Sequence, residues 1–267
     1  MPRSLWKGAV SFGLVTIPVK LYSATETKDI SFRQVHPADG GRIKYKRVCD
    51  SCGEEIQYAQ IGKGYETADG RMVILEAEDF QDLPLPTAKQ VEILQFIKLD
   101  ELDPTAYDKA YVLEAEGPGA KPYVLLREAL RREGKAALVK VALRSRESIA
   151  LIRPDGETLM LHTLLWPDEV REVGFAAPPA DVAASDAEVA MAATFIDQLS
   201  APYAPAELTD SYREALEQVV AAKLGDAPTP VAAADTAEPG EVVDLVAALR
   251  ASVEAAKKRR EAAAEAG

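Results

Sequence analysis

Four side chains in the first quarter of the chain have the types and the spacing of metal ligands. Cys49 and Cys52 form a Cys-x-x-Cys turn followed by Gly53, which is half of a zinc knuckle. His36 and Asp39 repeat the same spacing upstream and supply a nitrogen and an oxygen. The pattern predicts a structural zinc site. Three alternatives stay open: an empty knuckle, a redox pair of cysteines, and one metal held by the cysteine pairs of two chains.

Positive charge is the second feature that could do chemistry. The 267-residue chain has a net charge of −12 and an isoelectric point near 4.8. Residues 121–153 nevertheless hold nine Lys or Arg against three Asp or Glu. A basic patch on an acidic protein favours a polyanion bound on one face, while the rest of the surface repels it. An Arg-rich surface exposed only to solvent would give the same count.

A second basic stretch, RIKYKRV at residues 42–48, directly precedes the cysteines. Its alternation predicts a strand with cations on one face and apolar residues on the other. Residues 30–36 are expected to form the neighbouring strand. Such a pair could hold a phosphate backbone on its cationic face while its apolar face closes a core. An ordinary solvated sheet face is the alternative.

Motifs of the common enzyme classes are absent from the sequence. There is no G-x-x-x-x-G-K-[ST], no G-x-G-x-x-G after a strand, no H-E-x-x-H and no G-x-S-x-G. His36 and His162 are the only histidines, which leaves little for acid–base catalysis at neutral pH. The sequence therefore predicts a binding protein that is not an enzyme. No cofactor is required, and structural zinc is the one candidate.

Hydrophobic periodicity predicts mostly short strands. Residues 5–23 are expected to form two strands around a turn at 11–14, and Pro18 indicates an edge strand or a bulge. Residues 122–133 are expected to form an amphipathic helix that ends at Gly134. Many short strands separated by turns predict a barrel or a sandwich. The other expected strands are 71–75, 90–97, 110–113, 136–143, 148–153 and 158–166.

The composition changes after residue 171, and the chain is expected to have four parts. They are a barrel core at 1–175, a helical extension at 186–225, a flexible linker at 226–240, and a helix with a short basic cluster at 241–267. A tethered helix with an apolar stripe is typical of a partner-docking element, and a core helix is the alternative. The stripe consists of Val242, Leu245, Val246, Leu249 and Val253.

Membrane and secretion signals are also absent from the sequence. No apolar run approaches the ~18 residues that a membrane-spanning helix needs. The N-terminus lacks the continuous apolar region of a signal peptide. Two cysteines in one Cys-x-x-Cys do not form a disulfide framework. We therefore expect a cytoplasmic protein with no membrane partner.

Four segments of the chain stand out: WKGAVSFGLVTIPVKLY (6–22), IKYKRVC-x-x-C (43–52), YVLLREAL (123–130) and HTLLWPDEVR (162–171). They resemble the bacterial Ku family, and the similarity covers most of the chain. The resemblance implies an α+β, mainly β fold. It consists of a Ku-type β-barrel core with bridging strands that form a DNA-encircling homodimeric ring, followed by C-terminal helices. Residues 121–153 are then expected to help form the bridge over DNA.

The same resemblance implies a function in non-homologous end joining. The homodimer would bind double-stranded DNA ends without sequence specificity, protect them, and recruit and stimulate the ATP-dependent DNA ligase D. A nucleoid-associated place in the cytoplasm is expected for such a protein. The alternatives are a zinc-ribbon adaptor without end-specific DNA binding, and a metal-dependent hydrolase or nuclease built on residues 76–82.

Site residues follow from the resemblance as a set. The apolar stripe of the C-terminal helix is expected to dock ligase D. Basic side chains are expected to line the DNA channel and to contact sugar and phosphate rather than base edges. The expected lining residues are Lys20, Arg33, Lys44, Lys46, Arg127, Arg131, Lys140, Arg144 and Arg146.

Overall fold

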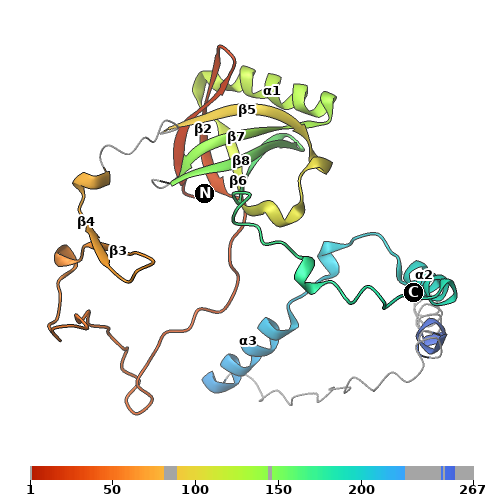
Figure 1. Cartoon of the computed structure of the whole chain (residues 1–267). Helices are drawn as coiled ribbons and strands as arrows, with labels where there is room; N and C mark the ends of the chain where they lie inside the picture. The colour runs from red at the N-terminus through yellow and green to blue at the C-terminus, as the bar shows by residue number, and fades with distance from the viewer. Residues whose placement is uncertain (1, 81–88, 144–145, 226–247, 249, 256–267) are drawn as a thin grey trace. The chain divides into compact units, whose positions relative to one another are not determined.

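The computed structural model divides the chain into two compact units, residues 1–172 and 173–267 (Figure 1). The first unit holds a β-barrel and a long insertion, and the second unit holds helices. The predicted four-part organisation stays a prediction. The structure describes residues 2–80, 89–143, 146–225, 248 and 250–255.

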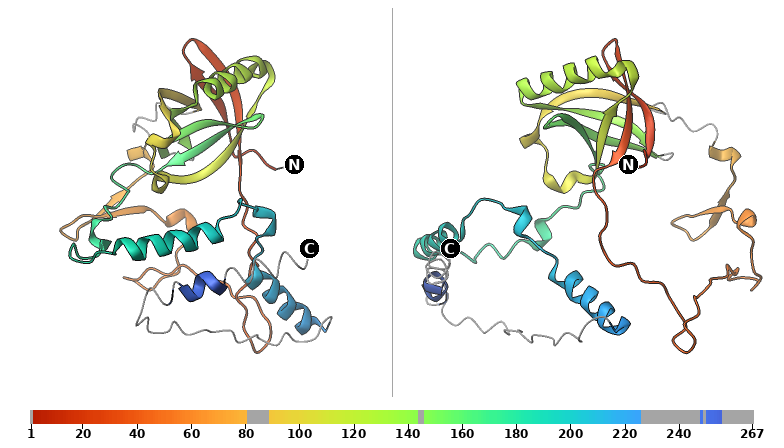
Figure 2. Two further views of the ribbon diagram at one scale, coloured as in Figure 1. Left: turned by 90° about the vertical axis from the view of Figure 1, so that its right-hand side faces the viewer. Right: turned by 180° about the vertical axis from the view of Figure 1, so that it is seen from behind.

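Seven strands of the first unit close into a barrel in the order β1-β2-β6-β9-β8-β7-β5 (Figures 1 and 2). Neighbours are antiparallel except β1 and β5, which run parallel where the barrel closes. Closure leaves these strands without free edges. The predicted barrel is confirmed. Its strands are β1 (Trp6–Phe12), β2 (Val15–Ser23), β5 (Gln90–Lys98), β6 (Tyr107–Ala115), β7 (Lys135–Leu143), β8 (Arg146–Asp155) and β9 (Thr158–Leu164).

Strand β2 illustrates how the sequence builds the core. Ile17, Val19 and Leu21 are buried at a spacing of two, because alternate side chains of a strand face the same side. The carbonyl of Pro18 accepts a hydrogen bond from the N–H of Glu116 at 2.8 Å. The register of β2 with β6 begins at the next residue, where Val19 pairs with Ala115. The missing N–H of Pro18 falls at the end of the β2–β6 pairing, where proline is tolerated. The predicted edge strand or bulge is wrong, because β2 pairs in regular register with β1 on one side and with β6 on the other.

The parallel seam between β1 and β5 requires a residue without a side chain. A Cβ atom on Gly8 would overlap the carbonyl oxygen of Lys89 and the ring of Trp6. The N–H of Ala9 donates to that same carbonyl at 3.0 Å. Glycine at position 8 therefore allows the close approach that completes the barrel.

Helix α1 (Ala120–Glu133) packs against β2, β7 and β8 and lies along the barrel in all views (Figures 1 and 2). Tyr123, Leu126 and Leu130 are buried at the spacing of one helix face. The helix ends at Gly134, whose φ of +61° is the left-handed conformation that glycine adopts without strain. The predicted helix and its end are confirmed.

A long insertion, residues 24–89, separates β2 from β5. Its two-stranded sheet pairs β3 (Lys63–Glu66) with β4 (Met72–Leu75). The strands predicted at 30–36 and 42–48 are wrong, because that stretch forms only isolated bridges. No described residue of the insertion is buried. Apolar alternation alone does not form a strand where no second layer covers the apolar face.

In the second unit, helices α2 (Asp186–Leu199) and α3 (Ser211–Leu224) each begin at a cap. The hydroxyl of Ser185 accepts a hydrogen bond from the N–H of Glu188, whose carboxylate accepts one from the N–H of Ser185 at 2.7 Å. The predicted bounds of α2 are confirmed. Helix α3 begins later than predicted, because Asp210 supplies its N-terminal cap.

The predicted C-terminal helix is described only in part. Residues 248 and 250–255 are helical, and the side chain of Val253 is buried. Within the described part of the chain, no helix is both long and apolar enough to cross a membrane. The predicted linker at 226–240 lies outside the described residues, as do Val242, Leu245, Val246 and Leu249.

Candidate nucleic-acid interface

The predicted phosphate-binding cations lie on two different parts of the first unit. The structure builds residues 121–153 into α1, β7 and β8, so that this basic block belongs to the barrel. The insertion carries the remaining basic candidates. The barrel group is Lys20, Arg127, Arg131, Lys140 and Arg146; the insertion group is Arg33, Lys44 and Lys46; Arg144 lies outside the described residues.

Lys20 shares a carboxylate with a second lysine on the barrel. The Nζ atoms of Lys7 and Lys20 lie 2.8 and 3.5 Å from Oε1 of Glu116. The hydrogen bond from Lys7 is the main cause that lowers the pKa of Glu116 below its ordinary value. The carboxylate is therefore ionised at neutral pH and offsets part of the positive charge of Lys20.

Two further barrel cations are also paired. Nζ of Lys140 lies 3.4 Å from Oε2 of Glu147, across the β7–β8 pair. Nη2 of Arg146 donates to Oε1 of Glu169 at 2.7 Å. A phosphate that bound either cation would compete with a carboxylate already in place.

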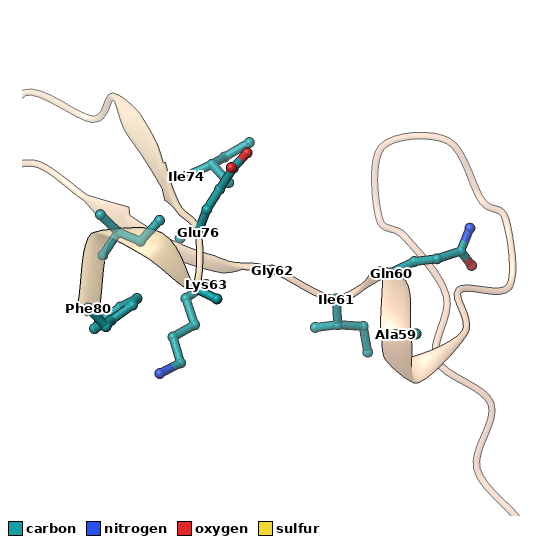
Figure 3. Close-up of a pocket in the computed structure, with 11 residues that line it drawn as sticks. Ala59, Gln60, Ile61, Gly62, Lys63, Ile74, Glu76 and Phe80 are labelled. Atoms are coloured by element: carbon teal, nitrogen blue, oxygen red, sulfur yellow. The ribbon is translucent and has the colours of Figure 1, made fainter. Parts of the chain in front are cut away.

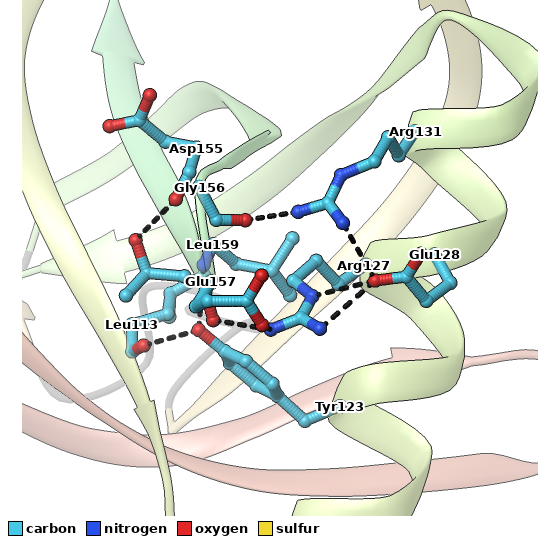
Figure 4. Close-up of polar contacts among 10 residues, drawn as sticks. Leu113, Tyr123, Arg127, Glu128, Arg131, Asp155, Gly156, Glu157 and Leu159 are labelled. Carbon is cyan, nitrogen blue, oxygen red and sulfur yellow. Dashed lines mark hydrogen bonds and ion pairs between the residues drawn. The ribbon is translucent and has the colours of Figure 1, made fainter.

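Arg127 joins α1 to the turn between β8 and β9 (Figure 4). Its Nη1 donates to the backbone oxygen of Glu157 at 2.5 Å and lies 2.8 Å from the Glu157 carboxylate. Nε and Nη2 both donate to Glu128, whose hydrogen bonds are the main cause that raises the pKa of Arg127. Arg131 donates to Glu128 at 2.9 Å and to the carbonyl of Gly156. Both arginines hold the helix on the barrel.

Tyr123 makes a second, buried joint between α1 and the barrel (Figure 4). Its hydroxyl donates to the carbonyl of Leu113 at 2.7 Å and accepts from the N–H of Leu159 at 2.6 Å. Leu113 and Leu159 are paired in the β6–β9 register. The tyrosine therefore satisfies two backbone groups where these strands separate.

The basic residues of the insertion are less fully paired. Within the described part of the chain, neither Arg33 nor Lys44 has an acidic partner, and both are exposed. Nζ of Lys46 lies 2.6 Å from Oε2 of Glu55, but both groups are largely exposed. Ion pairs of this kind are weak and easily exchanged for another anion. The insertion thus offers the most accessible of the predicted cations.

Two further cations of the insertion lie over aromatic rings. The guanidinium carbon of Arg47 lies 5.4 Å from the ring centroid of Tyr58, and Nζ of Lys63 lies 4.3 Å from that of Phe80. The expected lining set omits both cations, although the charge of the insertion could have indicated them. Lys63 and Phe80 also border an open cleft of about 900 Å³ (Figure 3). Its other lining residues include Ala59, Gln60, Ile61, Ile74 and Glu76.

The predicted metal ligands form two separate turns. Nδ1 of His36 lies 3.1 Å from Oδ1 of Asp39, and a hydrogen bond from the N–H of Gly41 lowers the pKa of Asp39. The N–H of Cys52 donates to the sulfur of Cys49, which is the main cause that lowers the pKa of that thiol. Among the described residues, no group of three or more His, Cys, Asp or Glu is placed to hold a metal ion. The zinc site stays a prediction.

A family comparison decides the assignment of this barrel. The family described as the Ku70/Ku80 beta-barrel domain matches residues 11–191, which include nearly all of the barrel and its insertion. The chain belongs to the Ku family. The expected Ku-type barrel followed by C-terminal helices is therefore confirmed.

Curated members of the Ku family match almost the whole chain. Proteins named non-homologous end joining protein Ku are 50% identical over 261 residues in Streptomyces griseus, 48% over 259 in Frankia casuarinae and 40% over 266 in Mycobacterium tuberculosis. These alignments cover 97%, 97% and 96% of the chain. The chain spans 65% of the length of the first two relatives and 96% of the third.

Proposed function

We propose that the chain binds double-stranded DNA ends without sequence specificity, as a homodimeric ring that protects the ends in non-homologous end joining. It acts without enzymatic activity, and it recruits and stimulates the ATP-dependent DNA ligase D. Family membership carries the proposal, because relatives that match 96 to 97% of the chain are named for non-homologous end joining.

The insertion is the part best suited to contact the DNA backbone. Arg33 and Lys44 have no ion pair with any described residue, so each can neutralise a phosphate without first losing one. Contacts of this kind add affinity that falls with salt, and they read no base sequence.

A second copy of the chain would cover surfaces that a single copy leaves open. In the insertion, Tyr65 and Ile74 are 63% and 70% exposed, and no described residue there is buried. In α3, Tyr212 and Leu224 are 76% and 73% exposed. Exposed apolar side chains in such numbers are typical of surfaces that meet another protein. These exposed side chains support the proposed homodimeric ring, in which a second copy would bury them.

The C-terminal helix is the proposed ligase-docking element. A double substitution, Leu245→Asp with Leu249→Asp, should abolish stimulation of the ligase while leaving DNA-end binding unchanged. Lys257→Gln lies beyond the stripe and serves as the control. Ligase stimulation that survives the double substitution would place the docking surface elsewhere.

Competition between linear and covalently closed DNA of one sequence tests the central proposal. Linear DNA should shift in a native gel, and closed circles should neither shift nor compete, because a ring must thread onto an end. Circles that compete as well as linear fragments would refute the ring and leave a general basic patch. Absence of binding to either form would favour an adaptor without DNA affinity.

A further inference from the structure

The described turn of the C-terminal helix, residues 248 and 250–255, holds one buried side chain. Val253 is 8% exposed, and it is the only buried residue that the structure describes in the second unit. The turn is regular, since the hydroxyl of Ser252 donates to the carbonyl of Ala248 at 2.9 Å. Neighbouring turns of one helix flank a side chain but leave its outer face open. A second segment must therefore cover Val253.

Helix α2 is the segment beside this turn. The dark blue turn lies next to α2 in all three views of Figures 1 and 2. One face of α2 is partly buried, and its members recur at helical spacing: Met191, Phe195 and Gln198. Another face of the same helix carries Val189 and Ile196, which are 56% and 65% exposed. Cover on α2 is thus confined to one face, here called the α2 face.

We propose that the α2 face is an internal docking site for the C-terminal helix, and that docking masks the apolar stripe of that helix. Val253 belongs to this stripe and is buried. A stripe that packs on α2 cannot contact a partner protein at the same time. The masking rests on the proposed role of the stripe in ligase docking, whereas the internal contact does not.

The α2 face is stabilised by contacts local to α2. Ser185 and Glu188 form the capping box that begins the helix, and the N–H of Ser185 donates to the Glu188 carboxylate at 2.7 Å. The first turn also carries Asp186, a favourable charge at a helix N-terminus. The docking surface therefore needs no ordering by its occupant, and the entropic cost of docking falls on the C-terminal helix alone.

Charge favours the same pairing of segments. Helix α2 contains the carboxylates of Asp186, Glu188 and Asp197 and no Lys or Arg. The C-terminal segment carries Arg250 and the basic run KKRR at residues 257–260. Opposite charge on two segments steers them together and disfavours other partners of the acidic helix. The C-terminal helix is therefore complementary to α2 in charge as well as in apolar surface.

The covalent connection makes even a weak contact effective. Residues 226–247 join α3 to the described turn, and a chain of that length can span up to about 70 Å. Such a tether gives an effective concentration in the millimolar range, so a contact of low intrinsic affinity is populated. A partner that needs the free stripe then binds with an affinity reduced by the fraction of chains in which the helix is undocked.

Amide hydrogen exchange of the full chain tests the internal contact. A short helix alone is marginal in water, so slow exchange at residues 250–255 reports docking. Phe195→Ala, on the α2 face, should speed this exchange several-fold, and Val189→Ala, on the exposed face, is the matched control and should not. Alanine is the best helix former, so both variants keep α2 folded. Unchanged exchange in Phe195→Ala, or equal acceleration in both variants, would overturn the proposal.

Titration with DNA ligase D tests the masking. Phe195→Ala should tighten the apparent affinity about tenfold or more, as expected where the free form is a minor state, and Val189→Ala should not change it. Unchanged affinity in Phe195→Ala would overturn the masking if Leu245→Asp with Leu249→Asp still abolishes stimulation of the ligase. If that double substitution also has no effect, ligase docking and masking both fail, while the exchange result alone decides the internal contact.

Discussion

The Tyr123 joint makes the sharpest prediction for the stability of the barrel. Tyr123→Phe keeps the ring and removes only the hydroxyl, which bridges the carbonyl of Leu113 and the N–H of Leu159. The two buried backbone groups are left without a partner, at a cost of about 1–3 kcal/mol each that already includes the lost hydrogen bonds. Partial closure of the strands offsets part of this. We expect the free energy of unfolding to fall by about 2–4 kcal/mol.

Urea unfolding followed by tryptophan fluorescence measures this change. The two tryptophans of the chain, Trp6 and Trp166, both belong to the first unit, so the signal reports on the barrel. The urea concentration at the midpoint of unfolding should fall, while the slope of the unfolding free energy against urea concentration stays unchanged. Tyr203→Phe is the matched control, because Tyr203 is 81% exposed, and it should change stability by less than about 0.5 kcal/mol. A loss below about 1 kcal/mol for Tyr123→Phe would refute the reasoning.

The same residue has a pH signature. Burial is the main cause that raises the pKa of Tyr123 above its ordinary value of 10.0. The unfolded chain therefore loses this proton at lower pH than the folded chain. The contribution to stability is complete below pH 10.0 and is lost as pH rises through the folded-state pKa. The free energy of unfolding of Tyr123→Phe should not show this loss. An identical dependence of that free energy on alkaline pH in both proteins would contradict the assignment of the loss to Tyr123.

Three further predictions separate DNA contacts from structural contacts. Arg33→Gln and Lys44→Gln should each reduce the slope of log affinity against log salt by about 0.9 per lost phosphate contact, or about 1.8 in a homodimer; an unchanged slope removes that residue from the interface. Arg127→Gln should lower the melting temperature and keep the slope, and a reduced slope would contradict its structural role. Burial, followed by the nearby Arg153 guanidinium, lowers the pKa of His162 below 6.5. The contribution of the neutral imidazole to stability is therefore present above pH 6.5 and is lost as pH falls through the folded-state pKa. Urea unfolding at a series of acidic pH values should show this loss in the unsubstituted protein and not in His162→Gln.

The barrel could be predicted from the sequence because its pattern and its packing agree. Alternation along β2 placed Ile17, Val19 and Leu21 in the core, and helical spacing placed α1 and its end at Gly134. Each of these segments contacts a second layer, so local pattern and burial act together. Closure could not be predicted in the same way. It depends on the contact of Gly8 with Lys89, whose positions in the sequence are far apart.

The insertion could not be predicted by the same means. Residues 42–48 alternate as a strand would, but the described part of the chain leaves their apolar side chains exposed, and Tyr45 is 75% exposed. Conversely, β3 begins Lys-Gly and carries no apolar alternation, yet it pairs with β4 over its whole length. Strand formation depends on a neighbour more than on intrinsic preference. A segment that no described layer of the chain covers is therefore not predicted correctly from its own alternation.

Pairing within the folded chain, rather than the number of basic residues, decides which cations a polyanion can use. Residues 121–153 have the larger excess of positive charge, but Glu157 is thirty positions from Arg127 and still binds its guanidinium. A phosphate approaching such a residue must replace a carboxylate, so the net gain is small. Residues 42–47 hold four cations and no acid. We therefore propose the shorter stretch as the stronger candidate for phosphate contact, although Lys46 within it is paired with Glu55 at the surface. In this proposal an acidic protein holds DNA through the part of its chain that contributes least to its own core.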